Sequence, residues 1–64
     1  MKALAQEEKA RIRRISRRVS EHEFYKMWRE CEFLFMDWEA YGDVKYFRNT
    51  KTGEYVETWE SIGD

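Results

Sequence analysis

Few side chains in this sequence could carry out catalysis. His22 is the single histidine and Cys31 is the single cysteine. An acid–base pair would require His22 to face a carboxylate, but its neighbours Glu21 and Glu23 point in other directions on a helix. Cys31 lies on an apolar stripe, without the basic neighbour that activates a thiolate. We therefore expect no catalytic residue and no enzyme activity.

The sequence also has few residues that could bind a metal or a cofactor. A structural zinc site takes about four Cys or His ligands, whereas the chain has two such residues. The carboxylates Asp37, Glu39 and Asp43 lack the spacing of a calcium-binding EF-hand loop, and no glycine-rich phosphate loop is present. The sequence predicts neither a metal nor a cofactor.

The strongest chemical signal is a basic cluster near the N-terminus. Residues 1–18 carry seven basic and two acidic side chains, a net charge of +5, and residues 19–64 carry five and eleven, a net charge of -6. The cluster of candidate binding residues consists of Lys9, Arg11, Arg13, Arg14, Arg17 and Arg18. Such a helix suits nucleic-acid phosphates or an acidic partner, and it also suits pairing with the protein's own acidic body. The sequence leaves these three roles open.

The second signal is the number of aromatic residues. Three Trp, four Tyr and four Phe occur among 64 residues. Several large side chains lie off the apolar stripe of the segment 20–41, namely Tyr25, Phe33, Met36 and Tyr41. Aromatic residues and Met are enriched in protein interfaces, and exposed apolar patches usually mark a partner. The sequence predicts a protein partner, with a homodimer as another possibility.

Two helices are predicted in the first two thirds of the chain. Residues 3–19 are rich in good helix formers and carry a narrow stripe of Ile12, Ile15 and Val19. The apolar face then shifts, which predicts a break near Ser20, where Ser20 and Glu23 have the spacing of a capping box. A second, aromatic-rich helix is predicted over 20–41. Residues 32–38 also alternate like a strand, so the other interpretation is one helix followed by a three-stranded antiparallel meander.

Residues 43–59 have the pattern of a β-hairpin. Two β-prone runs flank the turn residues 49–53, in which Asn49 can cap the turn and Gly53 can adopt positive φ. Opposite charges favour a register in which Arg48 faces Glu54. That register puts Phe47, Tyr55 and Trp59 on one face, with Lys45 and Glu57 among them, and we expect this face to bind a protein.

The run Tyr46-Phe47-Arg48-Asn49-Thr50-Lys51-Thr52-Gly53-Glu54 resembles the second hairpin of WW domains. Glu57 stands where the second, ligand-binding tryptophan of that family belongs, and the chain has no proline. The resemblance therefore implies shared hairpin chemistry and not the binding of proline-rich ligands.

Taken together, these features predict one small α+β domain over residues 1–64. A lone thiol is typical of a reducing compartment, and no signal peptide or membrane span is apparent, so we expect a cytoplasmic protein that does not enter a membrane. We expect a non-enzymatic accessory or inhibitory protein that docks on a larger protein or complex. In its compact, polarised character it resembles the small modulators that phages and mobile elements use against host machinery. Nucleic-acid binding through the arginine-rich helix is the alternative.

Overall fold

The computed structural model describes residues 4–39 and 42–61, and it has an α+β fold built on one four-stranded sheet. In chain order the elements are α1 (Gln6–Ile15), β1 (Arg17–Arg18), α2 (Glu21–Tyr25), the 3-10 turn η1 (Trp28–Glu30), β2 (Cys31–Glu39), β3 (Gly42–Asn49) and β4 (Tyr55–Ser61). The strand order is β1-β4-β3-β2. β2, β3 and β4 form an antiparallel meander, and β1 runs parallel to β4.

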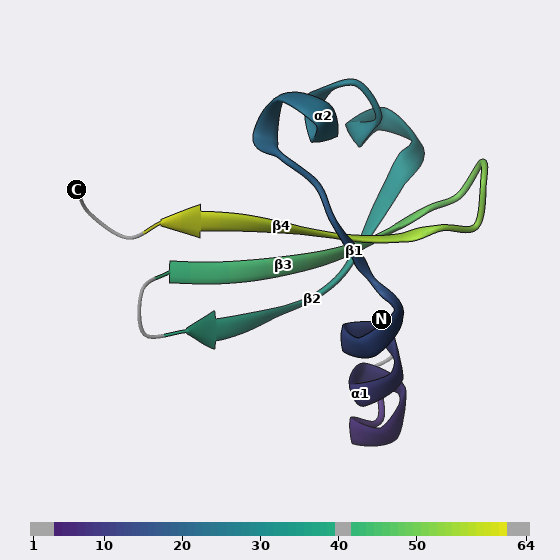
Figure 1. Cartoon of the computed structure of the whole chain (residues 1–64). Coiled ribbons are helices and arrows are strands. Elements are labelled where there is room, and N and C mark those ends of the chain that lie inside the picture. Colours follow the sequence, from purple (N-terminus) through teal and green to yellow (C-terminus); the bar gives the residue numbers. More distant parts are fainter. Residues whose placement is uncertain (1–3, 40–41, 62–64) are drawn as a thin grey trace.

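The helices lie on opposite faces of this sheet (Figure 1). The chain crosses from one face to the other at β1, whose Arg17 and Arg18 pair with Val56 and Glu57 of β4. We call the two faces the α1 side and the α2 side. A sheet that is covered on both faces can bury large side chains from both sets of alternating positions.

The first helix is shorter than predicted. It ends at Ile15 instead of residue 19, because Ser16 has an extended backbone and its hydroxyl donates a hydrogen bond to the carbonyl of Ile12 at 2.5 Å. The prediction of one helix over 3–19 is wrong for Arg17 and Arg18, which form the strand β1. Ile12 and Val19 are buried, as the apolar stripe predicts, whereas Ile15 is 47% exposed.

The second helix begins where it was predicted and ends much earlier. The Ser20 hydroxyl accepts a hydrogen bond from the Glu23 backbone N–H at 3.0 Å, which confirms Ser20 as the N-cap. The helix ends at Tyr25, so the prediction of a helix over 20–41 is wrong for residues 31–39, which form β2. The meander interpretation is closer, although it lacks β1 and the second helix. The predicted helix end at Tyr41 lies outside the described residues.

The hairpin is present with a register shifted by one residue. Asn49 accepts hydrogen bonds from the backbone N–H groups of Lys51 and Thr52 through its side chain, and Gly53 has a φ of 81°, both as predicted. The predicted pairing of Arg48 with Glu54 is wrong, because Arg48 is opposite Tyr55 and Phe47 is opposite Val56. The Asn49 N–H donates a hydrogen bond to the Glu54 carbonyl at 2.8 Å. The loop is therefore closed by Asn49 and Glu54, and not by Arg48 and Glu54 as predicted.

The core divides between the two sides of the sheet. On the α1 side, Ile12 packs with Phe35, Val44 and Tyr46, and the rings of Phe35 and Tyr46 stack with centroids 4.5 Å apart. On the α2 side, Phe24 packs on Phe47 with ring centroids 4.6 Å apart, next to the fully buried Val56. None of the helices among residues 4–39 and 42–61 has the length and hydropathy that a bilayer crossing requires.

Candidate protein-docking face

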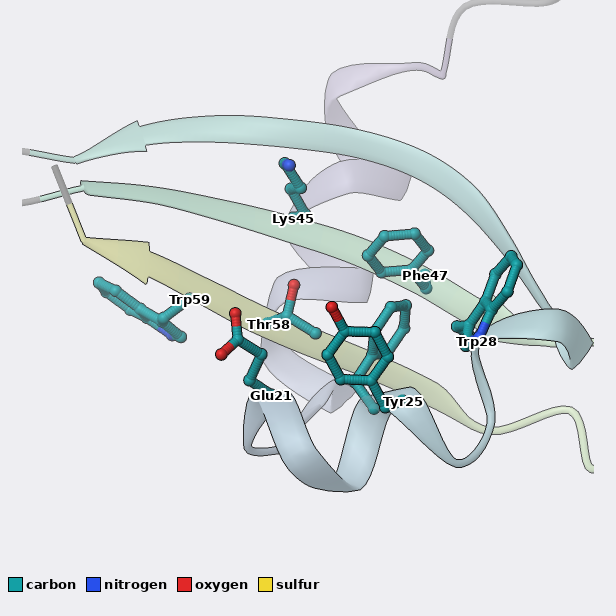
Figure 2. Close-up of a pocket in the computed structure, with 8 residues that line it drawn as sticks. Glu21, Tyr25, Trp28, Lys45, Phe47, Thr58 and Trp59 are labelled. Carbon is teal, nitrogen blue, oxygen red and sulfur yellow. The ribbon is translucent and has the colours of Figure 1, made fainter.

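A groove about 400 Å³ in volume lies on the α2 side, between the helix and the sheet (Figure 2). Its lining is mostly aromatic and comes from α2, η1, β3 and β4, with the residues Glu21, Phe24, Tyr25, Trp28, Lys45, Phe47, Thr58 and Trp59. Aromatic concave surfaces with a few polar groups are the usual form of a binding site. This groove is therefore the centre of the candidate site.

One wall of the groove comes from a short stretch of chain. Glu21, Tyr25 and Trp28 follow one another at intervals of four and three residues, which places them along one face of α2 and its continuation into η1. Phe24, on the neighbouring face, packs on Phe47 and anchors the helix to the sheet. The cap at Ser20 fixes where this wall begins.

The floor of the groove comes from the sheet. Lys45 and Phe47 alternate along β3 and so project to the same side, and Thr58 lies opposite Lys45 on β4. Phe47 is half-buried between Phe24 and Phe33, whose ring meets it edge-on with centroids 5.6 Å apart. The floor thus belongs to the folded core, whereas the walls remain open to solvent.

Several large aromatic side chains on the α2 side of the sheet are exposed to solvent. Tyr25 is 69% exposed, Trp28 50% and Phe33 55%. Trp38 is 74% exposed and is paired with Asp43, which alternates with Lys45 and Phe47, so it lies on the α2 side as well. We call Tyr25, Trp28, Phe33 and Trp38 the aromatic face. Large exposed patches of this kind are rare on soluble proteins that bind nothing.

The structure separates the three aromatic residues that were predicted to share one hairpin face. Phe47 lies on the α2 side, whereas Tyr55 packs against the core on the α1 side, below Arg11. The prediction of a common face is wrong because it depended on the pairing of Arg48 with Glu54, and the strands pair one residue away from that register. Trp59 borders the groove at the edge of β4, and its indole N–H donates a hydrogen bond to Glu57 at 2.9 Å.

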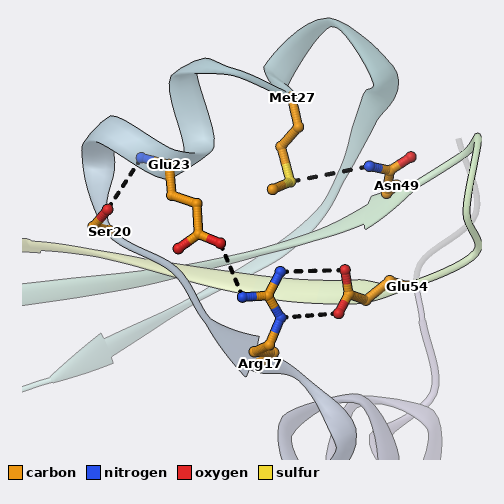
Figure 3. A network of polar contacts seen from close by, with 6 residues as sticks. All are labelled: Arg17, Ser20, Glu23, Met27, Asn49 and Glu54. Carbon is orange, nitrogen blue, oxygen red and sulfur yellow. Dashed lines mark hydrogen bonds and ion pairs between the residues drawn. The ribbon is translucent and has the colours of Figure 1, made fainter.

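Half of the predicted basic cluster makes polar contacts within the protein. Arg13 forms two hydrogen bonds with Asp37. Arg17 binds Glu54 and Glu23 from β1 (Figure 3).

Arg18 lies 3.9 Å from the Glu57 carboxylate and 4.3 Å above the Trp59 ring. Lys9 lies 5.6 Å from the centroid of the Phe35 ring. Arg14 contacts neither a carboxylate nor an aromatic ring within the described residues. This arrangement favours the interpretation in which the arginines bind the protein's own acidic body.

These contacts shift the ionisation of the groups involved. The hydrogen bond from Arg13 lowers the pKa of Asp37, and the hydrogen bonds from Arg17 lower the pKa of Glu54. Burial raises the pKa of the Cys31 thiol, so that little thiolate forms at neutral pH. In the described part of the chain, no group of three or more His, Cys, Asp or Glu residues could hold a metal ion.

Sequence patterns alone did not mark Glu21, Trp28, Trp38 and Thr58 as site residues. The spacing of Glu21, Tyr25 and Trp28 was available as a signal, and Tyr25 and Phe33 were already noted as lying off the apolar stripe. Trp38 fell within the predicted helix over 20–41, whereas in the structure it faces the α2 side of β2 and is 74% exposed, although Phe35 on the same strand is buried on the α1 side. No protein-family model matches the chain, and no curated protein or solved structure shows a significant similarity to it.

Proposed function

We propose that this protein is a small non-enzymatic accessory protein that docks on a larger protein through the aromatic face. The observation that supports this most is that Tyr25 and Trp28 line the groove, that Phe33 and Trp38 lie on the same side of the sheet, and that each of the four is at least half exposed. Tyr and Trp are the commonest hot-spot residues of protein interfaces, because each covers a large area with few rotatable bonds.

Nucleic-acid binding receives less support from the contacts. A phosphate-binding helix needs several guanidinium groups that are available to the ligand. Arg13, Arg17 and Arg18 instead contact carboxylates of the protein itself. The charge separation along the sequence thus has an intramolecular use. On the aromatic face, Arg29 lies near the Trp28 ring and Phe33 meets Phe47 edge-on, yet all four rings stay at least half exposed.

The test compares single-residue variants in capture of a partner from lysate and in binding of that purified partner. Trp28→Ala and Trp38→Ala remove exposed rings from the aromatic face, whereas Ile15→Ala removes an exposed apolar side chain from α1 and is the matched control. We expect each Trp variant to weaken binding of the partner by about 2 kcal/mol, roughly a thirtyfold rise in the dissociation constant. Equal binding by all three variants would contradict the proposal, as would a partner that is only a second copy of the chain.

A further inference from the structure

The groove carries one carboxylate that the fold leaves uncompensated. Glu21 lines the wall, is exposed, and has no ion pair with any described residue. Lys45, the other charged lining residue, is engaged in a contact of its own. A ligand that complements the groove must therefore supply a positive charge close to aromatic rings.

The aromatic rings of Tyr25 and Trp28 on the wall add a second constraint. Both rings are at least half exposed, so a planar side chain can lie against them. Glu21, Tyr25 and Trp28 follow one face of the same segment, and a long side chain that lies along this face would meet a carboxylate and two rings in succession.

The protein already uses this combination for its own arginines. The Arg18 guanidinium lies 4.3 Å above the Trp59 ring and 3.9 Å from the Glu57 carboxylate. Arg29 lies 5.5 Å from the centroid of the Trp28 ring, which has a second face. Guanidinium is the cation that suits such a site best, because it is planar, weakly hydrated, stacks on aromatic faces and binds carboxylates with two hydrogen bonds.

We infer that the groove receives an arginine side chain of the partner protein, with its guanidinium at Glu21 and against the Tyr25 ring, and its aliphatic stem towards Trp28. This inference rests on the proposed function, because it names the group by which the docked partner is recognised. Lysine fits less well because its ammonium is compact and more strongly hydrated. An uncharged analogue of arginine would lose the ionic part of the interaction with Glu21 and keep only neutral N–H donors.

The experiment titrates N-acetyl-arginine amide into the 15N-labelled protein and follows the three Trp indole N–H signals by NMR. N-acetyl-citrulline amide has nearly the same shape without the charge, and N-acetyl-lysine amide has the charge without the plane. We expect the arginine amide to shift the Trp28 signal and to leave the Trp38 signal in place. We expect Glu21→Gln to weaken this binding by up to about fivefold, the upper end of the effect of one exposed ion pair.

Glu32→Gln is the matched control, because Glu32 is an exposed carboxylate on β2 opposite Arg48, away from the groove. Equal binding of the citrulline and arginine amides would overturn the inference, as would an equal effect of the two Gln variants. The citrulline comparison uses the unchanged protein and so does not depend on the folding of a variant.

The two proposals fail in different ways. If partner docking depends on Trp28 and Trp38 while the arginine amide does not bind, only the arginine inference is wrong. If the arginine amide binds at Glu21 while partner docking ignores both Trp variants, the proposed docking face is wrong.

Discussion

Replacing Tyr46 by Ala tests whether α1 covers a core of the sheet. Tyr46 is 6% exposed, its ring stacks on Phe35, and it belongs to one cluster with Ile12 and Val44. Removing an aromatic ring from such a position costs about 3–5 kcal/mol, from lost burial and from the cavity that remains. At about 0.05–0.15 kcal/mol per residue, a chain of 64 residues has a total stability of roughly 3–10 kcal/mol. Tyr46→Ala should therefore remove much or all of it.

Trp38→Ala is the matched control for this substitution. Trp38 lies on the neighbouring strand β2 and is 74% exposed, so its removal should change the stability by no more than about 0.5 kcal/mol. Urea unfolding followed by circular dichroism measures both changes. If Tyr46→Ala has no folded baseline, Val44→Ala supplies a graded value, because Val44 is 1% exposed and the loss should be about 2 kcal/mol.

Two results would refute this reasoning. A loss of less than about 1 kcal/mol for Tyr46→Ala would mean that α1 does not seal this side of the sheet. A comparable loss for Trp38→Ala would mean that Trp38 is buried in solution, and it would remove one residue from the aromatic face.

Two further predictions concern the hairpin turn and the ion pair between α1 and β2. Gly53→Ala should destabilise the protein by about 1 kcal/mol, because Gly53 has a positive φ that Ala adopts at a cost, whereas the added Cβ would meet nothing within 4 Å. Thermal unfolding measures this loss, with Lys51→Ala in the same turn as the control. An unchanged melting temperature for Gly53→Ala would contradict the turn assignment. Asp37 has a lowered pKa because Arg13 donates hydrogen bonds to it, so its stabilising effect is present above the unfolded carboxyl pKa of about 3.9 and is lost as the pH falls through the lower folded value. The difference in stability between the protein and its Asp37→Asn variant should accordingly be constant near neutrality and vanish in acid, and a difference that persists at the lowest pH would argue against the ion pair.

The local signals in the sequence predicted the features that depend on neighbouring residues. Ser20 caps α2 because a hydroxyl at this position can reach an N–H three residues on, whatever the rest of the chain does. Asn49 and Gly53 form the turn for equally local reasons. The shift in the apolar stripe near Ser20 likewise indicated two helices with different surroundings, and these helices lie on opposite faces of the sheet.

Features that depend on distant partners were predicted less well. The hairpin register was inferred from a local pairing of Arg48 with Glu54, but Glu54 binds Arg17, which is 37 residues away in the sequence. Residues 31–39 have apolar residues at both helical and strand spacing, and a bulge between Phe33 and Phe35 interrupts their alternation. Periodicity alone could not decide between a helix and a strand that packs on both faces.

From the sequence alone we could predict the α+β class, the start of the second helix, the turn of the hairpin and the surplus of aromatic and basic side chains. Which of these side chains find partners within the fold became clear from the three-dimensional contacts. Arg13 reaches Asp37 from α1, which lies over β2. The crossing of the sheet at β1 brings Arg17 to Glu23 on α2 and to Glu54 before β4, and Arg18 to Glu57 on β4. Phe35 and Trp38 lie on the same strand, but Phe35 packs in the core on the α1 side whereas Trp38 faces the α2 side and stays exposed. Tyr25 and Trp28 stay exposed because the short α2 packs Phe24 on the sheet instead. Burial depends on contacts between residues far apart in the sequence, and composition and spacing along the chain do not specify those contacts.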